Sequence, residues 1–140
     1  MILAVLDTNV LASGTLNSSS APGQILNAWK KGQFELVLSA HIIDELERTL
    51  KKPYFQKRIS KLEVSDYIDL LKNESVIVYV STNKRIATHP EDDFVINTAL
   101  TGGADYLVTG DLRLLKKVGS RYLGINFVTP NDFLKVLQKN

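Results

Sequence analysis

The sequence predicts an α/β domain with a mainly parallel central sheet, and two observations support this. Short apolar runs bounded by turn residues alternate with helical patterns from end to end of the chain. The chain has 140 residues, no cysteine and 44% hydrophobic residues. This length is enough to bury one core without disulfide bonds but too short for two domains. We therefore expect a single domain over residues 1–140.

Five apolar runs predict the strands of this sheet, and the last three are rich in Val, Ile or Tyr. The predicted strands are Ile2–Leu6, Phe34–Leu38, Val76–Val80, Tyr106–Val108 and Ile125–Val128. Helical patterns lie between them. Because a helix separates most consecutive strands, the connections favour parallel pairing.

The helices are predicted from their periodicity and from the residues at their ends. Ser39 suits a helix N-cap, and Ser60 with Glu63 forms a capping box. Pro90 fits a first helical turn, and Gly102 follows the end of the same pattern. The predicted helices are Ala21–Lys31, Ala40–Lys51, Lys61–Asn73, Pro90–Leu100, Leu112–Lys117 and Pro130–Leu137.

Composition excludes several classes of protein. The absence of cysteine rules out a disulfide scaffold, a thiolate zinc site and a cysteine nucleophile. The apolar runs are too short to cross a bilayer, and no basic segment follows Met1 as it would in a signal peptide. We therefore expect a cytoplasmic protein with no membrane partner.

Four carboxylates lie near the C-terminal ends of the predicted strands. Asp7 ends the first strand and Asp111 follows the fourth. Glu45 lies on the helix after the second strand, and Asp92 lies in the first turn of the helix after the third. Reactive groups collect beyond these strand ends in an open parallel sheet, so we expect the four side chains to share one edge.

Periodicity places Asp92 on the buried stripe of its helix, in line with Val95 and Ile96, whereas Asp93 points about a quarter-turn away. A buried carboxylate is costly unless it is paired or coordinated, and this stripe has no local Lys or Arg. A cation is the simplest partner. For the other helix, periodicity does not choose between Glu45 and Glu47, which flank opposite sides of the apolar stripe.

Each acid also has a structural explanation when it is taken alone. Asp7 suits an Asx-turn or helix cap, Asp92 suits the positive end of a helix dipole, and Asp111 suits an N-cap. His41, four residues before Glu45, permits a metal-ligand interpretation, but no second His stands at the spacing of a zinc-binding helix. Four separate caps, however, need not share one edge of a sheet.

Clustered carboxylates suit a hard divalent cation such as Mg²⁺ or Mn²⁺, which prefers oxygen ligands and often binds phosphate oxygens as well. Such ions generate hydroxide, align it with a phosphodiester and stabilise the leaving oxygen. The sequence therefore predicts metal-assisted phosphodiester hydrolysis.

The same residues resemble the PIN-domain ribonucleases, and more closely the prokaryotic PIN proteins that are toxin components of toxin–antitoxin systems. The similar segments span nearly the whole chain, and their order and spacing are more specific than any one of them. They are Leu6–Gly14, Leu38–Leu46, Lys52–Phe55, His89–Asp93 and Ala99–Asp111.

The resemblance implies a three-layer α/β/α fold and a Mg²⁺- or Mn²⁺-dependent nuclease. It selects Glu45 over Glu47 and completes an acidic quartet of catalytic metal ligands, namely Asp7, Glu45, Asp92 and Asp111. It also implies that Thr8 and Asn9 orient the first carboxylate and a ligand water, and that Thr109 supports Asp111 or the metal shell.

The chain departs from the family pattern at two positions. Arg113 stands where many relatives carry another Asp, and His89 stands where an acid is common. Both changes put substrate preference in doubt, because they alter the charge at the rim of the site. Arg113, with Lys116 and Lys117 on the same predicted helix, is a candidate for contact with the phosphate backbone of RNA.

The expected partners are an RNA substrate, an antitoxin protein and further copies of the chain in a homodimer or tetramer. Two alternatives differ in class. A non-catalytic PIN-like RNA-binding or scaffold protein has no need for four converging acids. A phosphotransfer domain built on Asp7 fits poorly, since a phosphatase of the haloacid dehalogenase type needs a second Asp at the position of Asn9.

The charge balance agrees with a polyanion as the substrate. The chain carries 17 basic and 15 acidic residues, for a net charge of +2. Setting aside the four predicted ligands leaves 11 acidic residues against the 17 basic ones. The remainder of the molecule is therefore distinctly basic, as expected for a protein that binds nucleic acid.

Overall fold

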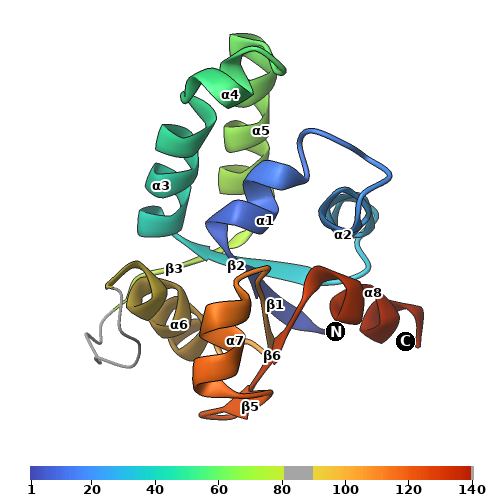
Figure 1. Ribbon diagram of the computed structural model, residues 1–140, viewed down its shortest axis with the longest axis vertical. Coiled ribbons are helices and arrows are strands. Elements are labelled where there is room, and N and C mark those ends of the chain that lie inside the picture. Colours follow the sequence, from blue (N-terminus) through green and yellow to red (C-terminus); the bar gives the residue numbers. More distant parts are fainter. Residues whose placement is uncertain (81–89, 140) are drawn as a thin grey trace.

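The structure is a computed structural model that describes residues 1–80 and 90–139. A six-stranded sheet in the order β3-β2-β1-β4-β6-β5 lies at the centre of this part of the chain (Figure 1). All neighbouring strands pair in parallel except β5, which is antiparallel to β6. The strands are β1 (Leu3–Leu6), β2 (Glu35–Ser39), β3 (Val76–Val78), β4 (Tyr106–Val108), β5 (Arg121–Tyr122) and β6 (Ile125–Val128).

Helices cover both faces of the sheet, so the predicted α/β/α architecture is confirmed (Figure 1). Helices α1 to α5 lie on one side, α6 and α7 lie on the other, and α8 packs against α2. Their bounds are α1 (Thr8–Ser13), α2 (Ala21–Lys30), α3 (Ala40–Leu50), α4 (Pro53–Gln56), α5 (Lys61–Glu74), α6 (Pro90–Gly102), α7 (Leu112–Val118) and α8 (Pro130–Gln138). None of the helices within the described residues has the length and apolar character needed to cross a membrane.

Strand β1 lies at the point where the chain connectivity reverses direction across the sheet. It pairs with β2 on one side and with β4 on the other, and Leu6 is in register with Val108. The side chains of Leu6 and Val108 are fully buried. The residues that follow them, Asp7 and Thr109, therefore emerge side by side at the edge where ligands bind in open α/β sheets.

Three elements in the structure were not among the predicted ones, and the first is the four-residue helix α4, which begins at Pro53. Helix α1 follows Asp7 directly and is only six residues long, too short to show an amphipathic period. Strand β5 is a two-residue exposed edge strand joined to β6 by a tight turn through Leu123 and Gly124, both with positive φ. The other strands agree with the sequence to within one or two residues at their ends.

Helix α6 carries Asp92 and corrects one expectation. Asp93 is only 6% exposed, so it does not point away from the interior as predicted. The prediction assumed one buried stripe, but α6 packs on β1, β2, β3 and β4 and also contacts α3, so more than one of its faces is covered. A close approach to β2 depends on Gly102, where an added Cβ would lie 2.4 Å from Val37 Cγ1.

Candidate active site

Asp7 is fixed at the end of β1 by donors from two elements. One carboxylate oxygen, Oδ1, accepts the backbone N–H of Val10 at 3.1 Å and so caps α1. The other oxygen, Oδ2, accepts the hydroxyl of Thr109, which follows β4. The cap predicted for Asp7 is therefore present, and one oxygen serves it while the other faces Thr109.

Burial raises the pKa of the Asp7 carboxyl above its ordinary value, and the negative charge of Asp111 acts in the same direction. The hydrogen bonds from Thr109 and from the backbone of Val10 and Asn9 oppose this rise without cancelling it. The charged form of Asp7 is thus poorly compensated. A cation close to Asp7 would lower the energy of that form.

Glu45 is brought to the same edge by α3, which packs against α1. Its Oε1 accepts a hydrogen bond from the hydroxyl of Thr8, the buried first residue of α1. Glu47 lies on the other flank of α3 and pairs with Lys72 of α5 at 3.9 Å. The structure thus ties Glu45, and not Glu47, to the residue that follows Asp7.

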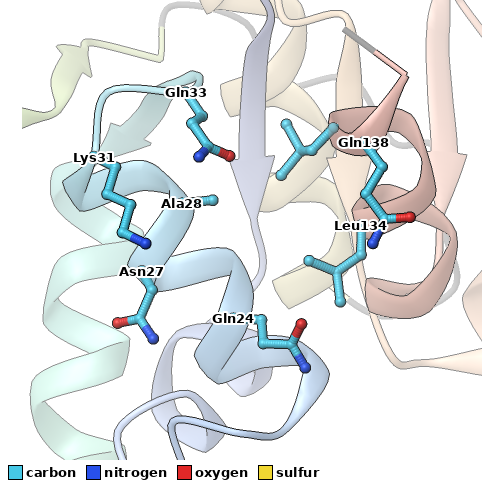
Figure 2. Close-up of a pocket in the computed structure, with 8 residues that line it drawn as sticks. Gln24, Asn27, Ala28, Lys31, Gln33, Leu134 and Gln138 are labelled. Carbon is cyan, nitrogen blue, oxygen red and sulfur yellow. The ribbon is translucent and has the colours of Figure 1, made fainter.

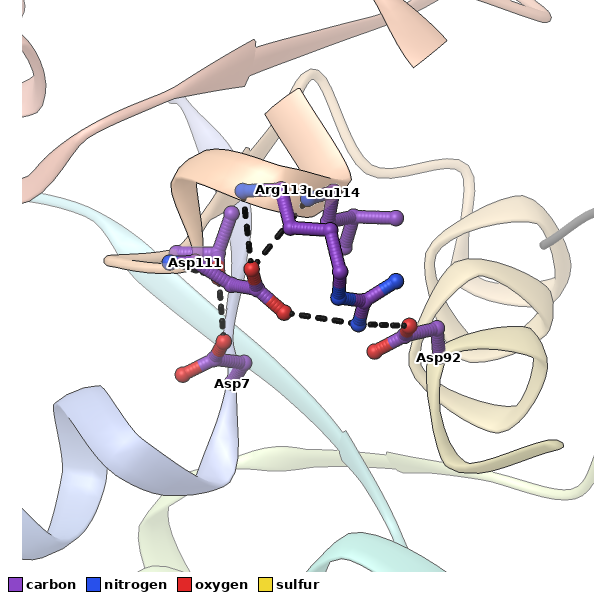
Figure 3. Close-up of polar contacts among 6 residues, drawn as sticks. Asp7, Asp92, Asp111, Arg113 and Leu114 are labelled. Atoms are coloured by element: carbon purple, nitrogen blue, oxygen red, sulfur yellow. Dashed lines mark hydrogen bonds and ion pairs between the residues drawn. The ribbon is translucent and has the colours of Figure 1, made fainter. Parts of the chain in front are cut away.

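Asp92 and Asp111 meet through Arg113 (Figure 3). The Nη2 atom of Arg113 donates to Asp92 Oδ2 at 2.8 Å and to Asp111 Oδ2 at 3.0 Å. The hydrogen bond to Asp92, together with the charges of Asp111 and Asp92, raises the pKa of Arg113. Asp92 therefore has a cationic partner in the chain. This partner is 21 positions away and does not lie on the same helix.

The four carboxylates fall into two pairs by the kind of partner that holds each of them. We call Asp7 and Glu45 the threonine-bound pair, and Asp92 and Asp111 the arginine-bound pair. Thr109 connects the two pairs, because its hydroxyl donates to Asp7 and accepts the backbone N–H of Asp111 at 3.0 Å.

The four side chains suit a hard divalent cation, because all of them are carboxylates and such ions prefer oxygen ligands. Hydroxyl groups or a guanidinium hold each carboxylate in place. Asp7 and Asp111 are close enough for their charges to interact, and Asp92 and Asp111 share one nitrogen of Arg113. Within residues 1–80 and 90–139, however, no group of three or more His, Cys, Asp or Glu side chains is already arranged to hold a metal ion. Among the described residues the structure therefore shows two pairs of carboxylates and not one preformed metal site.

Thr8 takes a different partner from the one that the resemblance implied, and Thr109 takes Asp7 as an additional partner. The hydroxyl of Thr8 binds Glu45 instead of Asp7, while that of Thr109 binds Asp7 and also supports the backbone of Asp111. Asn9 is exposed, and its backbone N–H contributes to the hydrogen bonds of Asp7. Residue spacing fixes neither choice, because both depend on how α1 is placed against α3 and β4.

The basic residues expected at RNA all lie on α7, the helix that Asp111 caps. Arg113 is half-exposed but is bound to Asp92 and Asp111, whereas Lys116 and Lys117 are exposed in the last turn of α7. His41 stacks on Phe94 of α6 with ring centroids 3.8 Å apart. His89 lies outside the described residues.

Tyr67 supports the site and had no signal in the sequence. Its hydroxyl donates to the carbonyl of Leu11 at 2.9 Å, which ties α5 to α1. Burial raises the pKa of Tyr67, so the phenol stays protonated and remains a donor. The two residues lie 56 positions apart, and no local pattern relates them.

A cavity of about 290 Å³ lies elsewhere, between α2 and α8 (Figure 2). Amide side chains line much of it, including Gln24, Asn27 and Gln138. Its lining contains none of the four carboxylates. The candidate active site is therefore distinct from this cavity.

Residues 4–113 match the family model described as a PIN domain. The chain belongs to the PIN-domain family. The uncharacterized protein MJ1680 of Methanocaldococcus jannaschii is 27% identical to it over 145 residues, which cover 99% of this chain and 93% of that protein. All four carboxylates and Arg113 lie within the matched PIN domain.

Two solved structures resemble this PIN domain. PAE2754 from Pyrobaculum aerophilum has a TM-score of 0.66 and 18% identity, and the match covers 99% of this chain and 91% of that chain. VapBC2 from Rickettsia felis, solved bound to a DNA fragment from their promoter, has a TM-score of 0.59 and 15% identity, with 91% of this chain and 98% of that chain covered. At these identities the likeness shows a shared fold.

Proposed function

We propose that this PIN protein is a metal-dependent endoribonuclease in which Asp7, Glu45, Asp92 and Asp111 hold Mg²⁺ or Mn²⁺. The observation that carries the proposal is the PIN match over residues 4–113, which contains all four carboxylates. PIN domains are in general nucleases. The parallel pairing of β1 with β4, which brings Asp7 beside Thr109, supports a common site.

In this proposal the chain positions the carboxylates and binds the substrate. The hydroxyls of Thr109 and Thr8 direct Asp7 and Glu45, and neutral donors leave the charge of each carboxylate available. A bound divalent cation supplies activated water and positive charge for phosphodiester hydrolysis. Lys116 and Lys117 would contact the RNA backbone.

The test is cleavage of labelled single-stranded RNA in the presence of Mn²⁺, with and without a chelator. We expect cleavage by the native chain, its loss on chelation, and a decrease of at least about 100-fold in Asp7→Asn and Asp92→Asn, more than is usual for losing a supporting residue. Cleavage that survives chelation, or that persists in both variants, would contradict the proposal. Tight RNA binding without cleavage would indicate the scaffold alternative.

Helix α3 offers a matched control for Glu45. Glu45→Gln removes a proposed metal ligand, whereas Glu47→Gln removes the same charge two positions away, where the side chain pairs with Lys72. We expect cleavage to fall at least about tenfold in the first variant and to change less than about twofold in the second, because exposed ion pairs contribute little. Equal losses would argue against Glu45 as a ligand.

We also propose that the chain is the toxin of a toxin–antitoxin pair. The support is the sequence resemblance to prokaryotic PIN toxins, together with a fold shared with VapBC2 of Rickettsia felis. The test is purification of the chain from its native source under mild conditions. A small protein should co-purify in a fixed ratio, and a chain that purifies alone would contradict this role.

A further inference from the structure

Arg113 places a positive charge between two of the proposed metal ligands (Figure 3). A single nitrogen, Nη2, lies 2.8 Å from Asp92 Oδ2 and 3.0 Å from Asp111 Oδ2. These carboxylates come from α6 and from the N-cap of α7, which are separate elements of the fold. At the arginine-bound pair, the guanidinium therefore provides the charge compensation that a divalent cation would otherwise provide.

A cation that binds Asp111 would have to bind its Oδ2 atom, which already accepts a hydrogen bond from Arg113. The other oxygen of Asp111, Oδ1, already accepts the backbone N–H groups of Arg113 at 3.0 Å and Leu114 at 3.2 Å. These two bonds begin α7, and they use both acceptor positions of that oxygen. Oδ2 is therefore the oxygen left for a cation, and a cation there would lie beside the guanidinium that this oxygen already binds, so the two positive groups compete for it.

The Arg113 side chain can leave this position without disturbing the fold. It is 47% exposed, compared with 17% for Asp92 and 29% for Asp111. Ion pairs of this exposure are weak, because water solvates a released guanidinium well. The backbone of α7 would stay in place through its Asp111 cap and through Leu114, which is buried in the core.

We propose that Arg113 is a built-in competitor of the divalent cation at Asp92 and Asp111. This inference rests on the proposed function, since it assumes that the cation binds there. In the absence of metal, Arg113 offsets one of the two negative charges of the pair and links α6 to α7. As the metal concentration rises, the cation displaces the guanidinium. The metal concentration needed to fill the site is therefore higher than it would be without Arg113.

The direct test is Mn²⁺ binding, measured by titration calorimetry and by the electron paramagnetic resonance of free Mn²⁺. Arg113→Ala and Arg113→Gln should bind Mn²⁺ about 3- to 10-fold more tightly than the native chain, since they lose weak competing ion pairs. The matched control is Arg121→Ala, which removes the same side chain and charge from the exposed edge strand β5. It should change the Mn²⁺ affinity less than about twofold, because a distant surface charge is screened.

Thermal unfolding gives a second readout that does not depend on activity. In chelator, Arg113→Ala should melt at a lower temperature than the native chain, because Asp92 and Asp111 then repel each other without a counter-ion. With saturating Mn²⁺ this difference should vanish or reverse, since the variant gains more from metal binding.

The outcomes separate this inference from the proposed function. If Arg113→Ala binds Mn²⁺ no more tightly than the native chain while both cleave RNA, the competition is wrong and the nuclease proposal stands. If Arg113→Ala binds Mn²⁺ more tightly but neither it nor the native chain cleaves any RNA, the competition stands and the nuclease proposal fails. If neither protein binds Mn²⁺, both fail.

Discussion

The two carboxylate pairs of the site are held by opposite kinds of partner. In the threonine-bound pair, Asp7 and Glu45 each accept a neutral hydroxyl, from Thr109 and Thr8 respectively. In the arginine-bound pair, Asp92 and Asp111 share a guanidinium nitrogen. The first kind of partner fixes the direction of a carboxylate and leaves its charge, whereas the second also offsets part of the charge of the pair.

This difference separates two effects that a structural ion pair usually combines: fixing the position of a carboxylate and offsetting its charge. Burial raises the pKa of Asp7 although three donors serve its carboxylate, so hydrogen bonds alone do not compensate that charge. The charge of the threonine-bound pair is thus left for a cation, whereas part of the charge of the arginine-bound pair is offset within the chain. Variants that remove single hydroxyls or single charges can test this distinction.

Among these substitutions, the largest effect on the free energy of unfolding is expected for Thr109→Val, because Thr109 connects the two pairs. Its fully buried hydroxyl donates to Asp7 and accepts the N–H of Asp111. Valine has nearly the same shape but leaves both partners unsatisfied. We expect the free energy of unfolding to fall by about 1–3 kcal/mol and RNA cleavage to fall about 10- to 100-fold, measured by denaturant unfolding and the labelled-RNA assay.

Thr98→Val is the matched control for this substitution. Thr98 is also fully buried, and its hydroxyl bonds to Ser39 Oγ at 2.9 Å and to the carbonyl of Phe94 at 2.7 Å, neither of which belongs to the four carboxylates. It should lose stability of similar order, about 1 kcal/mol, with little change in cleavage. Equal losses of cleavage in both variants would show that Thr109 acts only through stability.

A smaller effect is expected for Thr8→Val, which removes the one hydroxyl that directs Glu45. The loss of a single hydrogen bond should lower the free energy of unfolding by about 0.5–1.5 kcal/mol. Thr8→Ser keeps the hydroxyl, so it should retain cleavage close to that of the native chain. If serine and valine at this position cleave RNA equally, the hydroxyl does not position Glu45 for the reaction.

The sequence predicted the fold and the neighbourhood of the site because both follow from local rules. Periodicity and caps identified the parallel sheet, and parallel strands end at a common edge. The meeting of Asp7 with the segment from Thr109 to Asp111 is a direct consequence of the register of β1 on β4.

Partner choice within the site could not be predicted in the same way. The burial of Asp93 depends on α3 and the sheet covering separate faces of α6, which an amphipathic wheel does not represent. The contact from Arg113 to Asp92 depends on the conformation of a long side chain that reaches between α7 and α6. Such contacts are set by tertiary packing, so the sequence indicates the positive charge of Arg113 near the site but not its two acidic partners.

The smallest effect on the free energy of unfolding is expected for Asp7→Asn, and it has the opposite sign. In the folded chain the pKa of Asp7 is raised above its ordinary value of 3.8, mainly by burial. The ionised carboxyl therefore destabilises the fold at neutral pH, and this cost is relieved as the pH falls through the raised pKa toward 3.8. Asparagine keeps the acceptor for Val10 and has no charge, so in chelator at pH 7 the variant should be more stable by up to about 1 kcal/mol.

That gain in stability should shrink on acidification, because the native carboxyl then becomes neutral too. The measurement is the melting temperature of both proteins in chelator at neutral and acidic pH. With saturating Mn²⁺ the order should reverse, since only the native chain keeps Asp7 as a ligand and metal binding stabilises the state that binds it. A variant that is less stable than the native chain at pH 7 in chelator would mean that the Thr109 and Val10 bonds outweigh burial. The threonine-bound pair would then hold its charge without a cation, and the contrast with the arginine-bound pair would be lost.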